Sequence, residues 1–158
     1  MIIKLIFNYC KMNLDHYAYL PGNNYKSYSF YSEGPNGRIK KTVIYSILWD
    51  DPVVYNLAFG DEDPKTGNID DTAKSNNQDR DKVLATVAAT INEFMNAYGN
   101  FPIYAQGSTP ARTRLYQLSI SNLLDEINID FMVMGFRNHA WELFEKNVNY
   151  EAFLVEKK

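Results

Sequence analysis

The chain has only one cysteine, Cys10, among its 158 residues, so it cannot form an internal disulfide. Disulfides belong mainly to oxidising compartments, so this count predicts a reduced, cytoplasmic protein. No apolar run approaches the roughly 18 residues that a membrane helix needs, so we expect no membrane span. The short apolar start, 1–7, is interrupted by 8–11 without a small-residue cleavage site, so we also expect no signal peptide.

An excess of basic charge is also missing. Lys and Arg number 16 against 19 Asp and Glu, which gives a net charge of −3 and no general attraction to nucleic acid. The net charge therefore neither favours nor excludes nucleic acid as a partner. With 46% hydrophobic, 22% charged and 15% aromatic residues, the composition predicts one folded globular domain with a bulky core.

Familiar catalytic and metal-binding motifs are absent as well. The sequence has no glycine-rich dinucleotide motif, P-loop or nucleophile elbow, and His16 and His139 lack partners at metal-ligand spacing. The stretch 61–67 superficially resembles a calcium loop, but Lys65 replaces an oxygen ligand and Gly67 comes one place late. The sequence therefore predicts no metal site, implies no particular cofactor, and leaves open whether the protein is an enzyme.

The first half of the sequence has the pattern of β-structure. Alternating residues predict strands over 25–33 and 39–49, joined as a hairpin by the turn 34–37. A third strand, 53–60, is apolar on both faces, which is typical of a central strand.

The second half alternates helices and strands. Apolar residues at helical spacing predict helices over 82–98 and 110–127, with Asp79 or Asp81 capping the first and Gly99 ending it. Pro110 suits the first position of the second helix. A short apolar run predicts a strand over 101–106, and a further strand is predicted over 129–136. A helical turn is predicted over 141–144, and alternating residues predict a last strand over 150–155.

We therefore predict a single α+β domain with a mixed sheet, two main helices and the order β-β-β-α-β-α-β-β. This order resembles that of the ribonuclease H-like fold, in which crossovers between parallel strands are right-handed. A nuclease of that kind needs converging carboxylates, for which Glu33, Asp61 and Glu93 are candidates. However, the end of the fourth strand, 106–108, carries no acid, so the sequence does not favour an active nuclease.

The domain is expected to cover residues 12–158, with 1–11 as an N-terminal extension; the alternative is that 1–11 form an edge strand. Within the domain, the segment 61–78 contains five acidic residues, and its apolar residues do not recur at the spacing of a helix or a strand. Loops of this length are usually functional or mobile, so we expect 61–78 to be the least ordered internal segment.

The start of helix 110–127 is the strongest candidate site. Arg112 and Arg114 lie where the helix dipole disfavours cations by about 0.3–1 kcal/mol each, which predicts an anion nearby. A phosphate would meet backbone N–H groups, hydroxyls and guanidinium groups there. Alternatively, nearby aspartates neutralise the arginines and a hydroxyl only caps the helix. The candidate ligand-binding residues are Gly107, Ser108, Thr109, Arg112, Arg114, Asp61 and Asp79.

The run 107–116 (GSTPARTRLY), together with 55–61 and 79–87, resembles a bacterial family of uncharacterised small proteins. The resemblance covers Met12 to the last residue, and it implies a bacterial cytoplasmic protein without assigning any catalytic residue. Two functions remain. One is binding of a nucleotide, phosphorylated metabolite or nucleic-acid backbone at helix 110–127; the other is a non-enzymatic protein interaction module, favoured by the many tyrosines and by 150–155 as an unpaired last strand.

Overall fold

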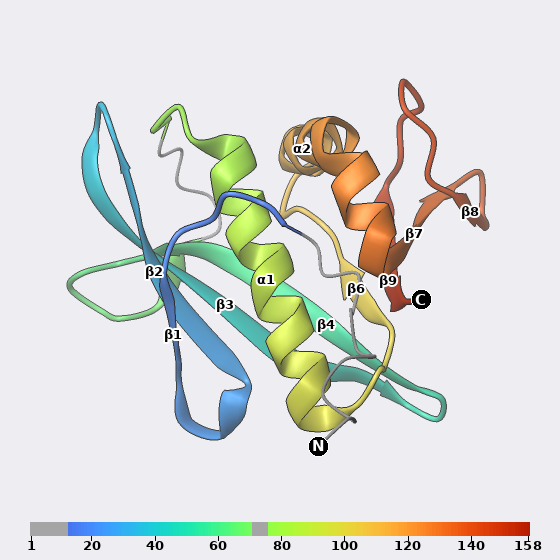
Figure 1. Cartoon of the computed structure of the whole chain (residues 1–158), viewed down its shortest axis with the longest axis horizontal. Coiled ribbons are helices and arrows are strands. Elements are labelled where there is room, and N and C mark those ends of the chain that lie inside the picture. Colours follow the sequence, from blue (N-terminus) through green and yellow to red (C-terminus); the bar gives the residue numbers. More distant parts are fainter. Residues whose placement is uncertain (1–12, 71–75) are drawn as a thin grey trace, which may run out of the picture.

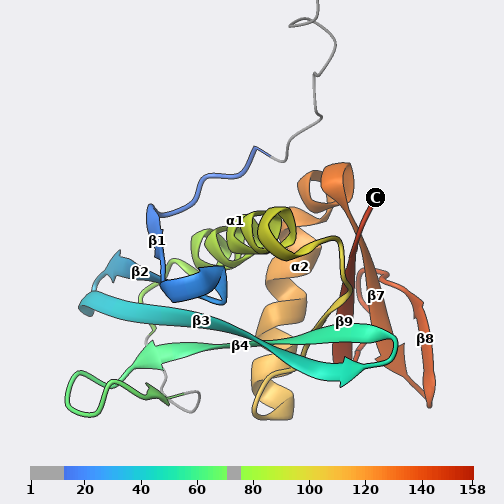
Figure 2. The ribbon, with the colours of Figure 1, turned by 90° about the horizontal axis from the view of Figure 1, so that it is seen from below.

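A computed structural model describes residues 13–70 and 76–158. They form a nine-stranded mixed sheet, and two long helices pack on one of its faces (Figure 1; Figure 2). The predicted α+β class is thus confirmed. The predicted extension 1–11 lies outside the described residues. Neither of the described helices is long and apolar enough to cross a membrane.

The sheet has the order β1-β2-β3-β4-β6-β9-β7-β8, and β5 pairs with β4 off this path. Only β4 and β6 pair in parallel among the described strands; the other pairs are antiparallel. The strands are β1 (Tyr19–Pro21), β2 (Ser27–Gly34), β3 (Gly37–Asp50), β4 (Val53–Glu62), β5 (Ile69–Asp70), β6 (Ile103–Ala105), β7 (Phe131–Arg137), β8 (Ala140–Leu143) and β9 (Ala152–Lys157).

The two helices are α1 (Arg80–Tyr98) and α2 (Pro110–Asp130), and a 3-10 turn, η1 (Asn23–Tyr25), joins β1 to β2. Gly99 ends α1 with a φ of 116°, a conformation that favours glycine. Pro110 opens α2, as its fixed φ and missing N–H predict. Both predicted helices are therefore confirmed; α1 begins two residues earlier and α2 ends three residues later than predicted.

The core lies between the sheet and the helices. Alternate residues of β2 and β3 are buried beneath α1, and the ring of Tyr45 stacks on Phe94 with centroids 4.2 Å apart. On the other side of the core, Ile127 of α2 belongs to the same buried cluster as Phe131 of β7 and Phe153 of β9. Burial of this aromatic and aliphatic surface is the main force that holds the helices against the sheet.

Two predictions about the last third of the chain are wrong. Residues 141–144 do not form a helical turn, because β8 pairs with β7 through a turn in which Asn138 and His139 both have positive φ. The last strand is not unpaired either, since β9 lies between β6 and β7. This insertion separates two strands that a ribonuclease H-like sheet would pair directly, so that resemblance is not confirmed.

The segment 13–25 belongs to the fold, although the sequence pattern predicts no element there. The Tyr17 backbone N–H donates to Thr86 Oγ1 of α1 at 2.9 Å, and β1 then pairs with β2. The long loop after β4 also contains structure, because β5 pairs with the end of β4. Residues 71–75 of that loop lie outside the described part of the chain.

Candidate ligand-binding site

The carboxyl ends of β2, β4 and β6 share one edge of the sheet, because these three strands run in the same direction. The N-termini of α1 and α2 meet at this edge over a hollow of about 740 Å³. Its charged and capping residues are Lys41, Asp61, Asp79, Arg80, Thr109 and Arg112, and we call it the polar hollow. Ligands of open α/β sheets favour this position.

One wall of the polar hollow is an ion pair between neighbouring strands. Lys41 Nζ of β3 contacts Asp61 Oδ1 of β4, and only 4% of Lys41 is exposed. The same ammonium group lies 5.7 Å from the centre of the Phe59 ring. Removing either charged partner would leave the other charge buried, which is strongly destabilising. This pair therefore fixes the end of β4 against β3.

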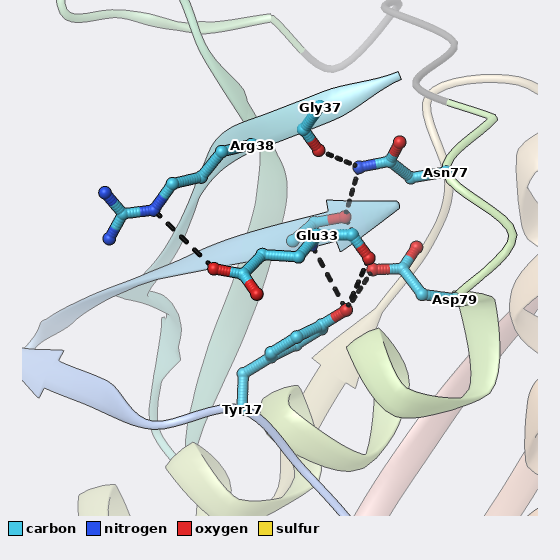
Figure 3. Close-up of polar contacts among 7 residues, drawn as sticks. Tyr17, Glu33, Gly37, Arg38, Asn77 and Asp79 are labelled. Carbon is cyan, nitrogen blue, oxygen red and sulfur yellow. Dashed lines mark hydrogen bonds and ion pairs between the residues drawn. The ribbon is translucent and has the colours of Figure 1, made fainter. Parts of the chain in front are cut away.

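Asp79 is held in a small hydrogen-bonded cluster (Figure 3). Its Oδ2 accepts hydrogen bonds from Tyr17 Oη at 2.8 Å and from Ser32 Oγ at 2.5 Å. Asn77 Nδ2 donates to Ser32 Oγ at 3.0 Å and to the Gly37 carbonyl at 2.9 Å. Burial is the main cause that raises the pKa of Tyr17, so its hydroxyl stays a donor. The cluster joins residues before β1, two strands and the start of α1.

Asp79 occupies the N-cap position of α1, but its carboxylate makes no capping hydrogen bond to the helix. Arg80 follows it and joins the two helices, since its Nε donates to the buried Ser119 Oγ of α2 at 3.1 Å. The same nitrogen lies 3.8 Å from Asp81 Oδ1. Arg80 is thus oriented at the junction of α1 and α2, beside the polar hollow.

The start of α2 is organised by its own residues. Thr109 caps the helix, and its Oγ1 accepts the Arg112 backbone N–H at 3.2 Å. The Gly107 N–H donates to Thr113 Oγ1 at 3.1 Å. A Cβ on Gly107 would lie 2.5 Å from the Thr113 nitrogen, so helix backbone occupies the space into which a side chain would project. Gly107 thus has a packing role, and Ser108 is exposed beside a different cavity.

Arg112 and Arg114 have different surroundings. Arg112 is half-buried and lines the polar hollow. Arg114 is exposed, and its Nη1 donates at 2.6 Å to Asn149 Oδ1 in the loop before β9. Among the described residues, those that line the polar hollow do not include Arg114.

The polar hollow thus collects Asp61, Asp79, Thr109 and Arg112 of the predicted set, while Gly107, Ser108 and Arg114 lie around it. Sequence reasoning missed Lys41 and Arg80. The sequence does contain a signal for Lys41. Side chains of a strand alternate between its two faces, and Lys41 lies on the same alternate positions as the buried residues of β3, so its cation lies on the core face. For Arg80 no sequence signal indicates its contact with Ser119.

The carboxylates considered as nuclease ligands are not brought together. Glu33 lies 3.9 Å from Arg38 in an exposed ion pair, and Glu93 is hydrogen-bonded to Tyr19. In the described part of the chain, no group of three or more His, Cys, Asp or Glu side chains is placed to hold a metal ion.

Comparisons with known proteins identify the family of the chain. Neither the curated proteins nor the solved structures contain a match to it. A model of a family of unknown function, DUF6934, matches residues 13–158. This match confirms the expected resemblance to an uncharacterised family and spans both helices and every described strand. The chain belongs to the DUF6934 family, a family of unknown function.

Proposed function

We propose that the protein binds a small phosphate-bearing molecule in the polar hollow. The observation that carries the proposal is the charge of the described lining residues: Lys41, Arg80 and Arg112 against Asp61 and Asp79, an excess of one positive charge. The N-termini of α1 and α2 add about half a positive charge each. An anion of charge near −2 would offset this excess.

The two carboxylates of the polar hollow already have other partners. Asp61 is paired with Lys41, and Asp79 accepts from two hydroxyl groups. Both acids are therefore held in place by these contacts. Because these contacts fix both carboxylates in place, the positive charge that they leave unbalanced supports the binding of an anion in the polar hollow.

The size of the polar hollow supports a small ligand. Its volume of about 740 Å³ lies within the range of roughly 300–1,000 Å³ typical of small-molecule sites. A nucleotide or a phosphorylated metabolite suits such a site better than a nucleic-acid backbone, given the net charge of −3. The proposal includes a cytoplasmic location in a bacterial cell, which the single cysteine and the family resemblance support.

Calorimetric titration with inorganic pyrophosphate tests this function with a matched pair of variants. A hydrogen bond to a charged group contributes about 1.5–3 kcal/mol, so Arg112→Ala should weaken binding roughly 10- to 150-fold. Arg114→Ala, two residues along the same helix, should bind like the natural protein. Absence of pyrophosphate binding to the natural protein, or equal losses in both variants, would overturn the proposal.

The β3–β4 hairpin favours a second candidate, a protein interaction module. Ile47 and Trp49 at the end of β3 are 55% and 58% exposed, and both are large apolar residues. Exposed apolar clusters of this kind often mark interfaces. This candidate predicts no pyrophosphate binding at the polar hollow, so the same titration separates the two functions.

A further inference from the structure

A second cavity lies between the sheet and the two helices. Its volume is about 380 Å³, and it is lined by core residues that include Leu57, Ile91, Ile120, Val133 and Phe153. We call it the apolar cavity. Protein interiors are close-packed, and voids larger than a water molecule are few. A partly open cavity of this size that reaches core residues is therefore a feature that needs an explanation.

The apolar cavity and the polar hollow are neighbours. Phe59, Leu84 and Tyr116 line both of them, and each of these side chains is half-buried. The rings of Phe59 and Tyr116 lie with their centroids 6.2 Å apart and form part of the boundary. A molecule that passes these three side chains would occupy both spaces.

The polar groups of the apolar cavity are few. Besides the Tyr116 hydroxyl, they come from Asn56, Gln106 and Ser108; every other described lining residue is apolar. A phosphorylated sugar or a similar polar metabolite would bury its hydroxyl groups without partners there, at a cost in free energy. An alkyl or isoprenoid chain would bury only apolar surface.

We infer that the ligand is amphipathic, with a phosphate-bearing head in the polar hollow and an apolar chain in the apolar cavity. The inference rests on the proposed phosphate-binding function and adds the chemical class of the ligand. The cavity of about 380 Å³ has room for an alkyl chain of several carbons.

Ethyl, hexyl and decyl phosphate test the inference by calorimetric titration. Burial of each added methylene should tighten binding about fourfold until the cavity is filled. Ala88→Leu and Ala105→Leu both place extra side-chain volume in the apolar cavity. Each of these two variants should remove the dependence of affinity on the length of the alkyl chain, while its affinity for ethyl phosphate stays that of the natural protein. Ala97→Leu, at an exposed position of the same helix as Ala88, is the control and should keep that dependence.

The outcomes separate this inference from the function on which it rests. Equal affinity for ethyl and decyl phosphate, with binding still lost in Arg112→Ala, would overturn the inference that the ligand carries an apolar chain. It would leave the proposed phosphate binding in place. If decanol binds as tightly as decyl phosphate, and Arg112→Ala does not change its affinity, the inference that the ligand carries a phosphate head is overturned. A chain-length dependence that persists in both cavity-filling variants would show that the chain binds elsewhere, and would overturn the inference. If Ala88→Leu does not fold, Ala105→Leu supplies the same comparison from the sheet side.

Discussion

Asp79 shows how a single residue departs from the role that its position predicts. Aspartate at an N-cap normally accepts a backbone N–H of its own helix, but this carboxylate accepts from Tyr17 and Ser32 instead. The gain is a connection between α1, β2 and the segment before β1. No local sequence pattern reveals it, because the three residues are far apart in the chain.

The substitution Ser32→Ala should lower the free energy of unfolding by about 1–3 kcal/mol, because it removes a partner of Asp79 and of Asn77 at a fully buried position. Urea denaturation monitored by circular dichroism measures this difference. Ser29→Ala, on the other face of the same strand, is the control and should stay within about 0.5 kcal/mol of the natural protein. Equal stabilities for the two variants would contradict the role of the cluster.

Glu62 predicts a dependence of stability on pH. Its pKa is lowered, first by the hydrogen bond from Lys40 and then by that from Thr42. A carboxyl group with a depressed folded-state pKa stabilises the fold above its unfolded pKa of about 4.3 and loses this contribution as the pH falls through the folded value. Glu62→Gln should therefore be less stable than the natural protein at neutral pH, and the difference should shrink in acid. A difference that stays constant across this range would refute the assignment.

The two arginines of α2 show what residue-level prediction can achieve. Sequence reasoning treats Arg112 and Arg114 as one pair, but residues two positions apart on a helix point in different directions. The structure accordingly places Arg112 at the polar hollow and Arg114 beside Asn149. Helical geometry alone predicts that they diverge, but which one meets the hollow depends on how α2 packs.

At the scale of elements, the long and periodic segments are predictable. Apolar spacing and caps locate α1 and α2, alternation locates β2 and β3, and a continuous apolar run locates β4. The elements that the sequence did not predict correctly are short. β8 follows a turn whose residues, Asn138 and His139, adopt positive φ without glycine, so the usual turn signal is missing. The three-residue strand β1 is too short to show a period.

Gly107 leads to a prediction about the connection between β6 and α2. Because an added Cβ would meet backbone atoms of the first turn of α2, Gly107→Ala should lower the free energy of unfolding by about 1–3 kcal/mol. Ser108→Ala, at the neighbouring exposed position, should have an effect of about 0.5 kcal/mol or less. Thermal or urea denaturation of the two variants measures both effects. If Gly107→Ala is as stable as Ser108→Ala, the glycine is not needed for packing.

For the whole molecule, the position of β9 is the feature that the sequence pattern does not determine. Pairing of a last strand depends on which edge remains available after the helices have packed, and this is a long-range property. One signal was present: residues 152–155 are four consecutive apolar residues, a pattern typical of a central strand. The shared edge of β2, β4 and β6 was predictable, because it follows from the hairpin and one crossover.

The central position of β9 can be tested by comparing it with the outer strand β8. Phe153 is 1% exposed and packs in the core, so Phe153→Ala should cost about 3–5 kcal/mol of unfolding free energy. Leu143 of β8 is 61% exposed, so Leu143→Ala should cost well under about 1 kcal/mol. Urea denaturation of both variants gives the comparison. If Phe153→Ala costs as little unfolding free energy as Leu143→Ala, β9 is not part of the core.

The most direct test of the phosphate-binding site is a ¹H–¹⁵N correlation spectrum of the protein recorded during titration with inorganic pyrophosphate. The amides of Asp61, Arg80 and Arg112 should shift with a common saturation curve, because they surround the polar hollow. The amide of Asn149, next to the Arg114 side chain, should stay unchanged. Shifts confined to Arg114 and Asn149, or no shifts at millimolar pyrophosphate, would contradict a phosphate-binding site at the junction of α1 and α2.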